Sequence, residues 1–405
     1  MSLAPGEREA LHGLADQGEA MLGQVLALAE INSGSRNLAG LSAVADRLAS
    51  LFGTLGPVTL RDPAPVDTVT PAGATVPLAL GRNLHLSVRP EAPVRVLLTG
   101  HMDTVFGPDD PFQTCRRLDE RTVNGPGVAD MKGGLVVMHA ALTALEASPF
   151  AGRIGYEVVI NSDEEISSPG SAALLLEAAG RVHSALTFEP ALPDGTLAGA
   201  RKGSGNFSAV VRGRSAHAGR NPEDGRNAVV AAADLALGLS RLALPGVSVN
   251  PARIDGGGPN NVVPDLAVLR FNVRPADHAG QQAASAAIAG LVDRVAADHG
   301  VTIDLHGHFA RPPKPMDARQ TALFTMVRDC GADLGLHISW RDTGGVCDGN
   351  NLAAAGLPVV DTMGVRGGAI HSADEFLCTD SLVERAQLAV LVLMRLAQGA
   401  PLPRI

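Results

Sequence analysis

Aromatic side chains are scarce in this sequence. They make up 3% of its 405 residues, so a core would consist mainly of aliphatic side chains. Hydrophobic residues still account for 45% and charged residues for 19%, which is enough to build a substantial core. The four cysteines are scattered, and no two have Cys-x-x-Cys spacing. We therefore expect reduced thiols rather than a disulfide framework or a thiolate zinc site.

A surplus of basic residues is also lacking, because 33 Lys and Arg face 42 Asp and Glu. The resulting net charge of −9 argues against nucleic acid as a main partner, since phosphates need cationic side chains. The first residues contain no basic head followed by an apolar run, and no uncharged apolar stretch is long enough to cross a membrane. We expect a soluble, cytoplasmic protein with no membrane partner.

The length exceeds that of one ordinary domain and suggests two. Apolar residues at helical spacing predict a helical segment over residues 7–30, a second helix over 38–55 and a closing helix over 379–396. Runs of branched apolar residues predict buried strands, which cover 94–98, 156–160, 185–188 and 357–360. Strands that alternate with helices in this way indicate an α/β fold.

Between residues 203 and 311 the pattern changes. Strand-like and helix-like segments follow in the order β-α-β-β-α-β, which is the split-βαβ arrangement. The segment from Thr343 to Asn350 then returns to the main domain. We therefore predict one larger α/β domain formed by residues 1–202 and 312–405, with residues 203–311 inserted as a smaller domain.

Potential metal ligands follow four of the predicted strands. They are His101, the pair Glu164 and Glu165, Glu189 and, after a loop, His371, while Asp130 opens a helix behind a glycine-rich loop. Singly, each has an ordinary structural interpretation, such as a helix N-cap for Asp130 or a solvated loop for the acidic run at 163–165. In open α/β sheets, however, ligands gather at the carboxyl ends of the strands. The shared position therefore favours one functional site.

The types of these side chains indicate a metal site. Two histidines and several carboxylates suit zinc, and cobalt or manganese could replace it. Five ligands suit two ions that share a bridging carboxylate, about 3.5–4 Å apart. Successive side chains at a strand end point in opposite directions, so one of Glu164 and Glu165 can bind metal while the other acts as general base. Their spacing leaves open which does which.

Five sequence strings resemble a known superfamily of di-zinc hydrolases, in order over nearly the whole chain. They are Gly-His-Met-Asp-Thr-Val (100–105), Gly-Val-Ala-Asp-Met-Lys-Gly-Gly (127–134), Asp-Glu-Glu (163–165), Phe-Glu-Pro (188–190) and Ile-His-Ser (370–372). The superfamily contains aminoacylases, acetylornithine deacetylase, succinyl-diaminopimelate desuccinylase and bacterial glutamate carboxypeptidases, and the match looks nearest the last. The resemblance implies a catalytic domain with a mixed, mainly parallel sheet flanked by helices, and an inserted lid and dimerisation domain.

The resemblance also implies two Zn²⁺ ions per subunit, with ligands carried over position by position: His101 and Glu189 for one ion, Glu165 and His371 for the other, and Asp130 as the bridge. Asp103 would orient His101 from behind. Glu164 would be the general base. A cis peptide bond between Asp130 and Met131 is implied as well.

The inserted domain adds four candidate substrate-binding residues: His217, Asn261, Arg274 and Arg311. His217 lies in Gly-Arg-Ser-Ala-His-Ala-Gly (213–219), which resembles a lid motif whose histidine reaches the partner subunit's active site in dimeric relatives. Arg274 and Arg311 would offer the paired donors that a substrate carboxylate favours, with the amide of Asn261 beside them. The structural alternatives are a turn at a dimer edge for His217 and a strand-end salt bridge for Arg274.

The sequence therefore predicts a zinc-dependent hydrolase that cleaves an amide bond next to a free carboxylate, most like a glutamate-type carboxypeptidase. Its substrate would be an N-acyl amino acid, a dipeptide or a glutamate conjugate. An N-acyl-amino-acid deacylase is the alternative within this class. A non-catalytic binding module is a remote alternative, since no ligand or base is missing. We also expect a homodimer through the inserted domain.

Overall fold

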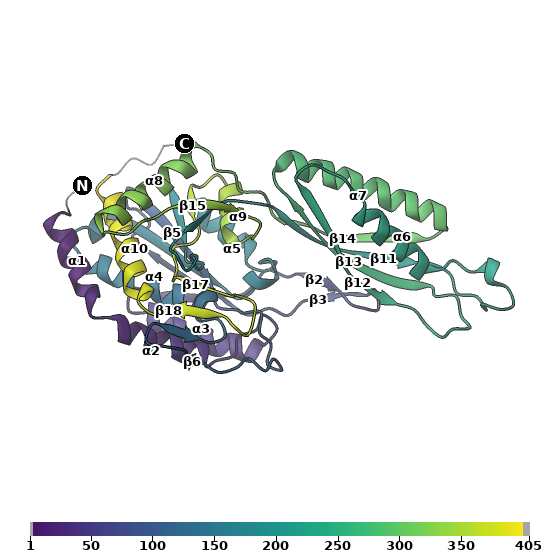
Figure 1. Cartoon of the computed structure of the whole chain (residues 1–405), viewed down its shortest axis with the longest axis horizontal. Helices are drawn as coiled ribbons and strands as arrows, with labels where there is room; N and C mark the ends of the chain where they lie inside the picture. Colours follow the sequence, from purple (N-terminus) through teal and green to yellow (C-terminus); the bar gives the residue numbers. More distant parts are fainter. Residues whose placement is uncertain (1–2, 400–405) are drawn as a thin grey trace.

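The computed structural model describes residues 3–399 and has two lobes that lie side by side (Figure 1). The larger lobe combines the N-terminal and C-terminal parts of the chain, drawn in purple to blue and in yellow-green. The smaller lobe is drawn in green and teal and holds the segment predicted as an insertion.

A six-stranded sheet forms the centre of the larger lobe. Its strands lie in the order β1 (Val58–Arg61), β4 (Asn83–Val88), β8 (Ile154–Asn161), β5 (Val94–His101), β9 (Ser184–Thr187) and β16 (Val359–Val360). β8, β5, β9 and β16 are parallel, whereas β4 and β1 are antiparallel additions at one edge. The predicted mixed, mainly parallel sheet is confirmed.

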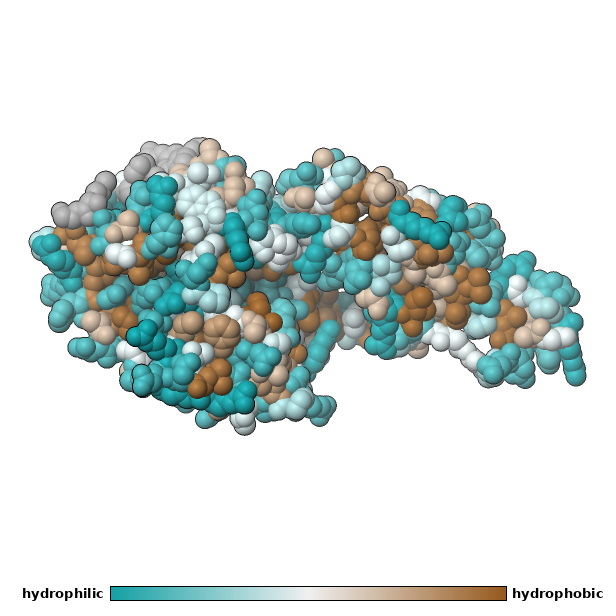
Figure 2. Space-filling model, in the orientation of Figure 1, coloured by the Kyte–Doolittle hydropathy of each residue, from teal (hydrophilic) through white to brown (hydrophobic). Residues whose placement is uncertain are grey.

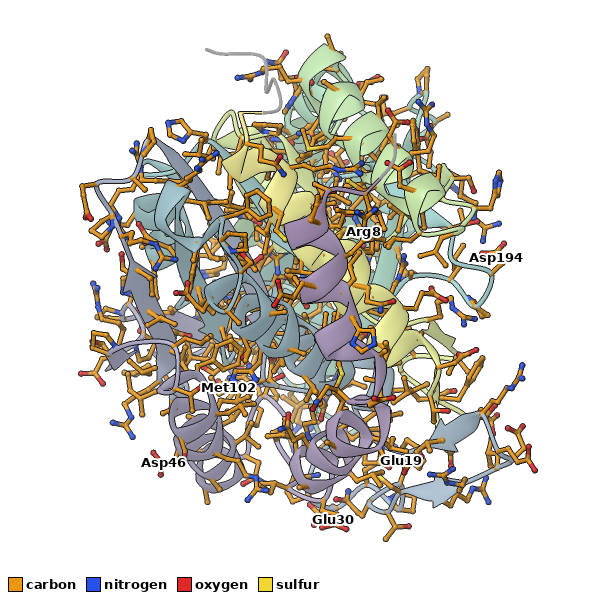
Figure 3. The ribbon with its side chains drawn as sticks, turned by 90° about the vertical axis from the view of Figure 1, so that its left-hand side faces the viewer. Arg8, Glu19, Glu30, Asp46, Met102 and Asp194 are labelled. Atoms are coloured by element: carbon orange, nitrogen blue, oxygen red, sulfur yellow. The ribbon has the colours of Figure 1, made fainter. Side chains whose placement is uncertain are left out.

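Helices cover both faces of this sheet. One face carries α1 (Pro5–Ala15), α2 (Gly18–Ala29), α3 (Leu38–Phe52), α4 (Gly133–Glu146), α8 (Ala318–Asp333) and α10 (Ser381–Ala397), and the other carries α5 (Ala172–Ala179) and α9 (Asp348–Ala354). Figure 3 looks onto the first face, where purple α1 lies in front of yellow α10. Side chains of β5 alternate between the faces: Val96 and Leu98 join the first core and Leu97 the second. Burial on both faces explains why Val96, Leu97 and Leu98 are consecutive apolar residues.

The segment predicted as helical over residues 7–30 is two helices. α1 ends with Asp16 as its C-cap and α2 begins at Gly18. Asp and Gly are both weak helix formers, and this short break lets Leu11 and Leu14 pack toward α10 while α2 turns along α4. Periodicity detected the apolar faces but not the break.

One segment, Val128–Glu146, is long and apolar enough to cross a membrane by length and composition. It comprises the turn η1 (Val128–Lys132) and α4, and 78% of its most apolar window is buried inside the protein. Its composition is that of a core helix between the sheet and α10.

The smaller lobe is an antiparallel sheet with two helices on one face. Its strands lie in the order β12 (Val247–Gly256), β13 (Leu266–Pro275), β11 (Ser204–Arg212) and β14 (Thr302–Arg311). α6 (Ala228–Ser240) and α7 (His278–His299) pack on it through a separate apolar core. The predicted order β-α-β-β-α-β is confirmed.

The larger lobe reaches across to the smaller one through the hairpin of β2 (Asp67–Val69) and β3 (Thr75–Pro77), which Figure 1 shows between the lobes. Nη2 of Arg212 donates to the main-chain oxygen of Gly73 at 2.8 Å, and Nη2 of Arg270 donates to that of Val69 at 2.9 Å. The hairpin thus holds the sheet of the smaller lobe on the face away from α6 and α7.

Short strands surround the carboxyl edge of the central sheet. β17 (Gly367–Gly368), β18 (Phe376–Cys378), β7 (Thr122–Asn124) and β6 (Arg116–Arg117) form one small sheet, and β10 (Leu197–Arg201) pairs with β15 (Trp340–Thr343). The sequence did not predict these elements individually, because two to five residues carry too little periodicity.

Candidate active site

The carboxyl edge of the central sheet carries three of the predicted ligands. β5, β8 and β9 are parallel neighbours, so their carboxyl ends meet at one edge. His101 is the last residue of β5, and Glu189 follows β9. Glu165 lies in the single turn η3 (Glu164–Ile166) after β8. This is where ligands collect in open α/β sheets.

Two loops complete the cluster. Asp130 lies in η1, where the chain enters α4, and the peptide bond between Asp130 and Met131 is cis, as predicted. His371 follows β17 with a φ of 63°, in the left-handed region that non-glycine residues rarely adopt. Residues held in such conformations concentrate at functional sites.

Asp130 lies between the two histidines. Its Oδ1 is 3.1 Å from Nε2 of His101, and its Oδ2 is 3.2 Å from Nε2 of His371. Nε2 of His371 is also 3.2 Å from Oε2 of Glu165, and Nε2 of His101 is 3.8 Å from Oε2 of Glu189. Each oxygen of Asp130 therefore faces its own group of one histidine and one glutamate, as a carboxylate shared by two ions would.

Negative charge is concentrated in this cluster. Burial raises the pKa of Glu165 to about 7, and the neighbouring Asp130 adds to the rise. Burial alone would lower the pKa of His101, but its acidic neighbours, Asp103 foremost, hold that pKa well above the usual value. Hydrogen bonds to Asp130 and Glu165 raise the pKa of His371 to about 11. Carboxylates this crowded and buried require cations, and divalent metals accept these ligand types.

Asp103 holds the imidazole of His101 and also the chain that carries the two glutamates. Nδ1 of His101 is 3.0 Å from the main-chain oxygen of Asp103 and 3.4 Å from its Oδ1. The carboxylate accepts hydrogen bonds from the N–H groups of Glu164 (3.1 Å) and Glu165 (3.2 Å) and from Oγ of Ser35 (2.7 Å). Nε2 of His101 is thereby left facing the cluster. Ser35 belongs to no motif, so sequence reasoning missed it.

A cavity of about 550 Å³ opens onto the cluster. Part of its wall comes from the smaller lobe, through residues of β11 and β13. Four arginines line it: Arg201, Arg274, Arg311 and Arg341. The cavity thus brings cationic side chains into the same space as the carboxylate-rich cluster, an arrangement suited to an anionic substrate.

The sequence model of peptidase family M20/M25/M40 matches residues 97–395, which include every candidate ligand from His101 to His371. The chain belongs to this family. It is a hydrolase of the metallopeptidase type, and the residues at the carboxyl edge of its sheet form a potential metal-binding group. The alternative of a non-catalytic binding module is therefore set aside.

Relatives of this M20 chain include two kinds of enzyme. Carboxypeptidase G2 from Pseudomonas sp. is 26% identical over 394 residues, which cover 95% of this chain and 91% of that protein. Succinyl-diaminopimelate desuccinylase from Xanthomonas oryzae pv. oryzae is 30% identical over 306 residues, 70% of this chain and 78% of that protein. The resemblance that the motifs indicated is confirmed.

Solved structures show the same fold. The M20 family metallo-carboxypeptidase Sso-CP2 from Sulfolobus solfataricus has a TM-score of 0.69 at 14% identity, covering 92% of this chain and 98% of that one. Human carnosine dipeptidase 1 has a TM-score of 0.70 at 14% identity, covering 97% of this chain and 100% of that one.

Two of the predicted substrate-binding residues of this M20 chain lie apart from the cavity. His217 and Asn261 are exposed on neighbouring loops of the smaller lobe, joined by a 2.9 Å hydrogen bond from the N–H of Ala218 to the main-chain oxygen of Asn261. Within residues 3–399, neither lines the cavity. Within one chain, His217 and Asn261 therefore lie away from the candidate metal ligands.

Arg311 has partners that the sequence did not indicate. Its side chain is buried, and Nη2 donates to Oε1 of Glu164 (2.8 Å) and to Oγ of Ser168 (2.9 Å). Nη1 pairs with Asp348 and donates to Oδ1 of Asn351 (2.7 Å). Both terminal nitrogens are therefore engaged, and the guanidinium holds the predicted base. A substrate carboxylate would have to displace one of these partners.

Arg201 is a cavity residue that the sequence reasoning missed. It is 8% exposed, and its Nε donates to Oδ2 of Asp361 at 2.7 Å. No acceptor among residues 3–399 takes a hydrogen bond from its two terminal nitrogens. In the sequence, Arg201 stands beside Lys202 and Gly203 and looks like part of a solvated turn. The hydrogen bond that holds its guanidinium is accepted by Asp361, which is 160 positions away and cannot be paired with Arg201 from the sequence.

Proposed function

We propose that this protein is a two-zinc carboxypeptidase that cleaves an amide bond next to a free carboxylate, most like a glutamate-type carboxypeptidase. The observation that supports it is the position of Asp130, with one oxygen toward each histidine–glutamate group, beside a cavity lined by arginines. An N-acyl-amino-acid deacylase is the second candidate, because a desuccinylase is among the relatives. N-acyl amino acids, dipeptides and glutamate conjugates are the substrates to test.

The five proposed ligands form two sites that share one carboxylate: His101 and Glu189 in the first, Glu165 and His371 in the second, and Asp130 in both. The donors fit zinc, with cobalt or manganese as substitutes, because they combine imidazole nitrogens with carboxylate oxygens. Ligand atoms of His101, Asp130 and Glu165 lie within 4.8 Å of one another, so the two sites are immediate neighbours around Asp130. When bound, two such ions would polarise the scissile carbonyl and acidify a water.

Glu164 is the proposed general base. Arg311 holds its Oε1, so the carboxylate is oriented and Oε2 is available to take a proton from water and pass it to the leaving amine. Burial raises the pKa of Glu164 well above the usual value, and Arg311 opposes that rise. We assign Arg311 this positioning role on Glu164 in place of the substrate contact expected from the sequence.

Arg274 and Arg201 are the proposed clamp for the substrate carboxylate. Nε of Arg274 donates to Oδ1 of Asn272 and its Nη1 to the main-chain oxygen of Gly344, each at 3.0 Å. These bonds fix the guanidinium plane and leave its Nη2 for a ligand. Arg201 is fixed through Nε alone and adds two further donating nitrogens. Planar guanidinium groups held in this way suit a carboxylate.

Converting the substrate's free carboxylate to an amide should lower kcat/KM by about 10²–10³, since a charged hydrogen-bonded pair is lost. The measurement compares an N-acyl glutamate with its α-amide, using enzyme whose zinc has been restored after chelation. In Arg274→Ala the preference for the acid should shrink, because the clamp is already impaired. Equal turnover of acid and amide would contradict the clamp, and no turnover of any N-acyl amino acid or dipeptide would contradict the proposed function.

The proposal includes a homodimer formed through residues 203–311, which would act as a lid and dimerisation domain. Val230 and Leu237 on α6 are 52% and 48% exposed, and β12 is an edge strand of its sheet. Figure 2 shows hydrophobic residues interrupting the polar surface of this lobe. An apolar helix face beside an unpaired strand edge can be covered by a second copy across a two-fold axis. His217 and Asn261 would then reach the cavity of the partner. We place the enzyme in the cytoplasm.

A further inference from the structure

Glu375 is a buried carboxylate that belongs to none of the ligand or substrate groups above. It is 1% exposed and lies four residues after His371, directly before β18. A carboxylate this buried is costly unless hydrogen-bond donors surround it. The loop that carries Asp130 supplies those donors.

The carboxylate of Glu375 accepts hydrogen bonds from three backbone N–H groups. Its Oε1 accepts from the N–H groups of Ala129 and Asp130, each at 3.0 Å, and its Oε2 accepts from that of Gly127 at 3.3 Å. Gly127 has a φ of 71°, which turns the chain so that the N–H groups converge. Concave runs of backbone N–H groups of this kind bind anions.

A second contact joins the same two segments with the donor and acceptor roles of side chain and backbone exchanged. Asn124 is 2% exposed, and its Nδ2 donates to the main-chain oxygens of Glu375 (2.7 Å) and Ala373 (3.0 Å). Here β7 and β18 pair as antiparallel strands. The loop of His371 and the loop of Asp130 are therefore fastened together by a side chain from each.

We propose that Glu375 is a positioning residue that sets where Asp130 stands relative to His371. It acts on the main chain of Asp130 and touches neither the substrate nor the metals. Since Asp130 is the shared ligand, a shift of its loop would weaken both metal sites together. This inference rests on the metal assignment proposed above.

Glu375→Gln tests this inference, because the amide retains one acceptor oxygen and puts an NH₂ donor against a backbone N–H. Zinc affinity is measured in buffers of fixed free zinc, together with the unfolding temperature of the metal-free protein. We expect zinc binding to weaken about 10–100-fold, as for other residues that support metal ligands from behind. Glu384→Gln is the matched control: Glu384 pairs with Arg366 outside the site, and its loss should leave zinc affinity unchanged.

Zinc affinity of Glu375→Gln within about twofold of the wild type would overturn the inference, whatever its activity. A purely structural role would lower the unfolding temperature of the metal-free protein and leave the affinity of the folded protein intact. If Glu375→Gln fails to fold, Glu375→Asp is the second variant. Its side chain keeps the negative charge but is one methylene shorter, so the carboxylate no longer reaches the three N–H groups. Zinc binding should still weaken by at least about tenfold. Wild-type protein that binds no zinc would contradict the proposed function instead.

Discussion

Glu164→Gln should lower turnover by about 10²–10⁴ while the metal content stays near that of the wild type. The amide keeps the shape of the side chain and can still accept from Nη2 of Arg311, but it cannot take a proton from water. Steady-state turnover of an N-acyl glutamate and zinc content by elemental analysis measure the two quantities on one preparation.

Glu165→Gln is the matched comparison, because it changes the adjacent residue in the same turn, η3. Oε2 of Glu165 faces Nε2 of His371 at 3.2 Å, so we expect this variant to lose metal as well as activity. If Glu164→Gln loses metal and Glu165→Gln retains it, the roles of the two neighbours are reversed.

Mixing two inactive variants should restore about a quarter of wild-type activity if His217 acts across the dimer. The variants are Glu164→Gln, which lacks the base, and His217→Ala, which lacks the imidazole. We propose that this imidazole donates to the developing oxyanion in the partner's site. In a mixed dimer, one site combines an intact Glu164 with an intact His217 from the partner, and the other site lacks both. When equal amounts of the two variants exchange subunits, half of the dimers are mixed. Since half of the sites in these mixed dimers are intact, about a quarter of all sites are active.

The experiment needs proof of subunit exchange, for example from mass-tagged chains. Mixing Glu164→Gln with differently tagged Glu164→Gln is the control and should restore nothing. The exposed position of His217, outside the cavity of its own chain, motivates this test. No recovery despite verified exchange would contradict the role of His217 in the partner's site.

The cluster of proposed ligands could be predicted from the sequence because its signals are local. Each of His101, Glu165 and Glu189 comes at or just after the end of an apolar run, and the parallel pairing of β5, β8 and β9 then brings those ends together. The inserted sheet and its helices were predictable for the same reason, since their periodicities alternate over stretches of nine or more residues.

The supporting contacts could not be predicted, since they join residues far apart in the chain. Arg311 pairs with Glu164 across 147 positions, and Glu375 accepts from the N–H of Asp130 across 245. Arg201 is held by Asp361 across 160. A lone arginine or glutamate in a loop has no periodicity that distinguishes a buried, paired side chain from a solvated one. The break between α1 and α2 escaped prediction because the apolar spacing continues across it.

Diffraction data collected on both sides of the zinc absorption edge test the central claim most directly. The account predicts two anomalous peaks about 3.5–4 Å apart, both bonded to Asp130, with His101 and Glu189 at one and Glu165 and His371 at the other. A crystal grown with zinc that shows no peak in this cluster, or a single peak away from Asp130, would contradict it.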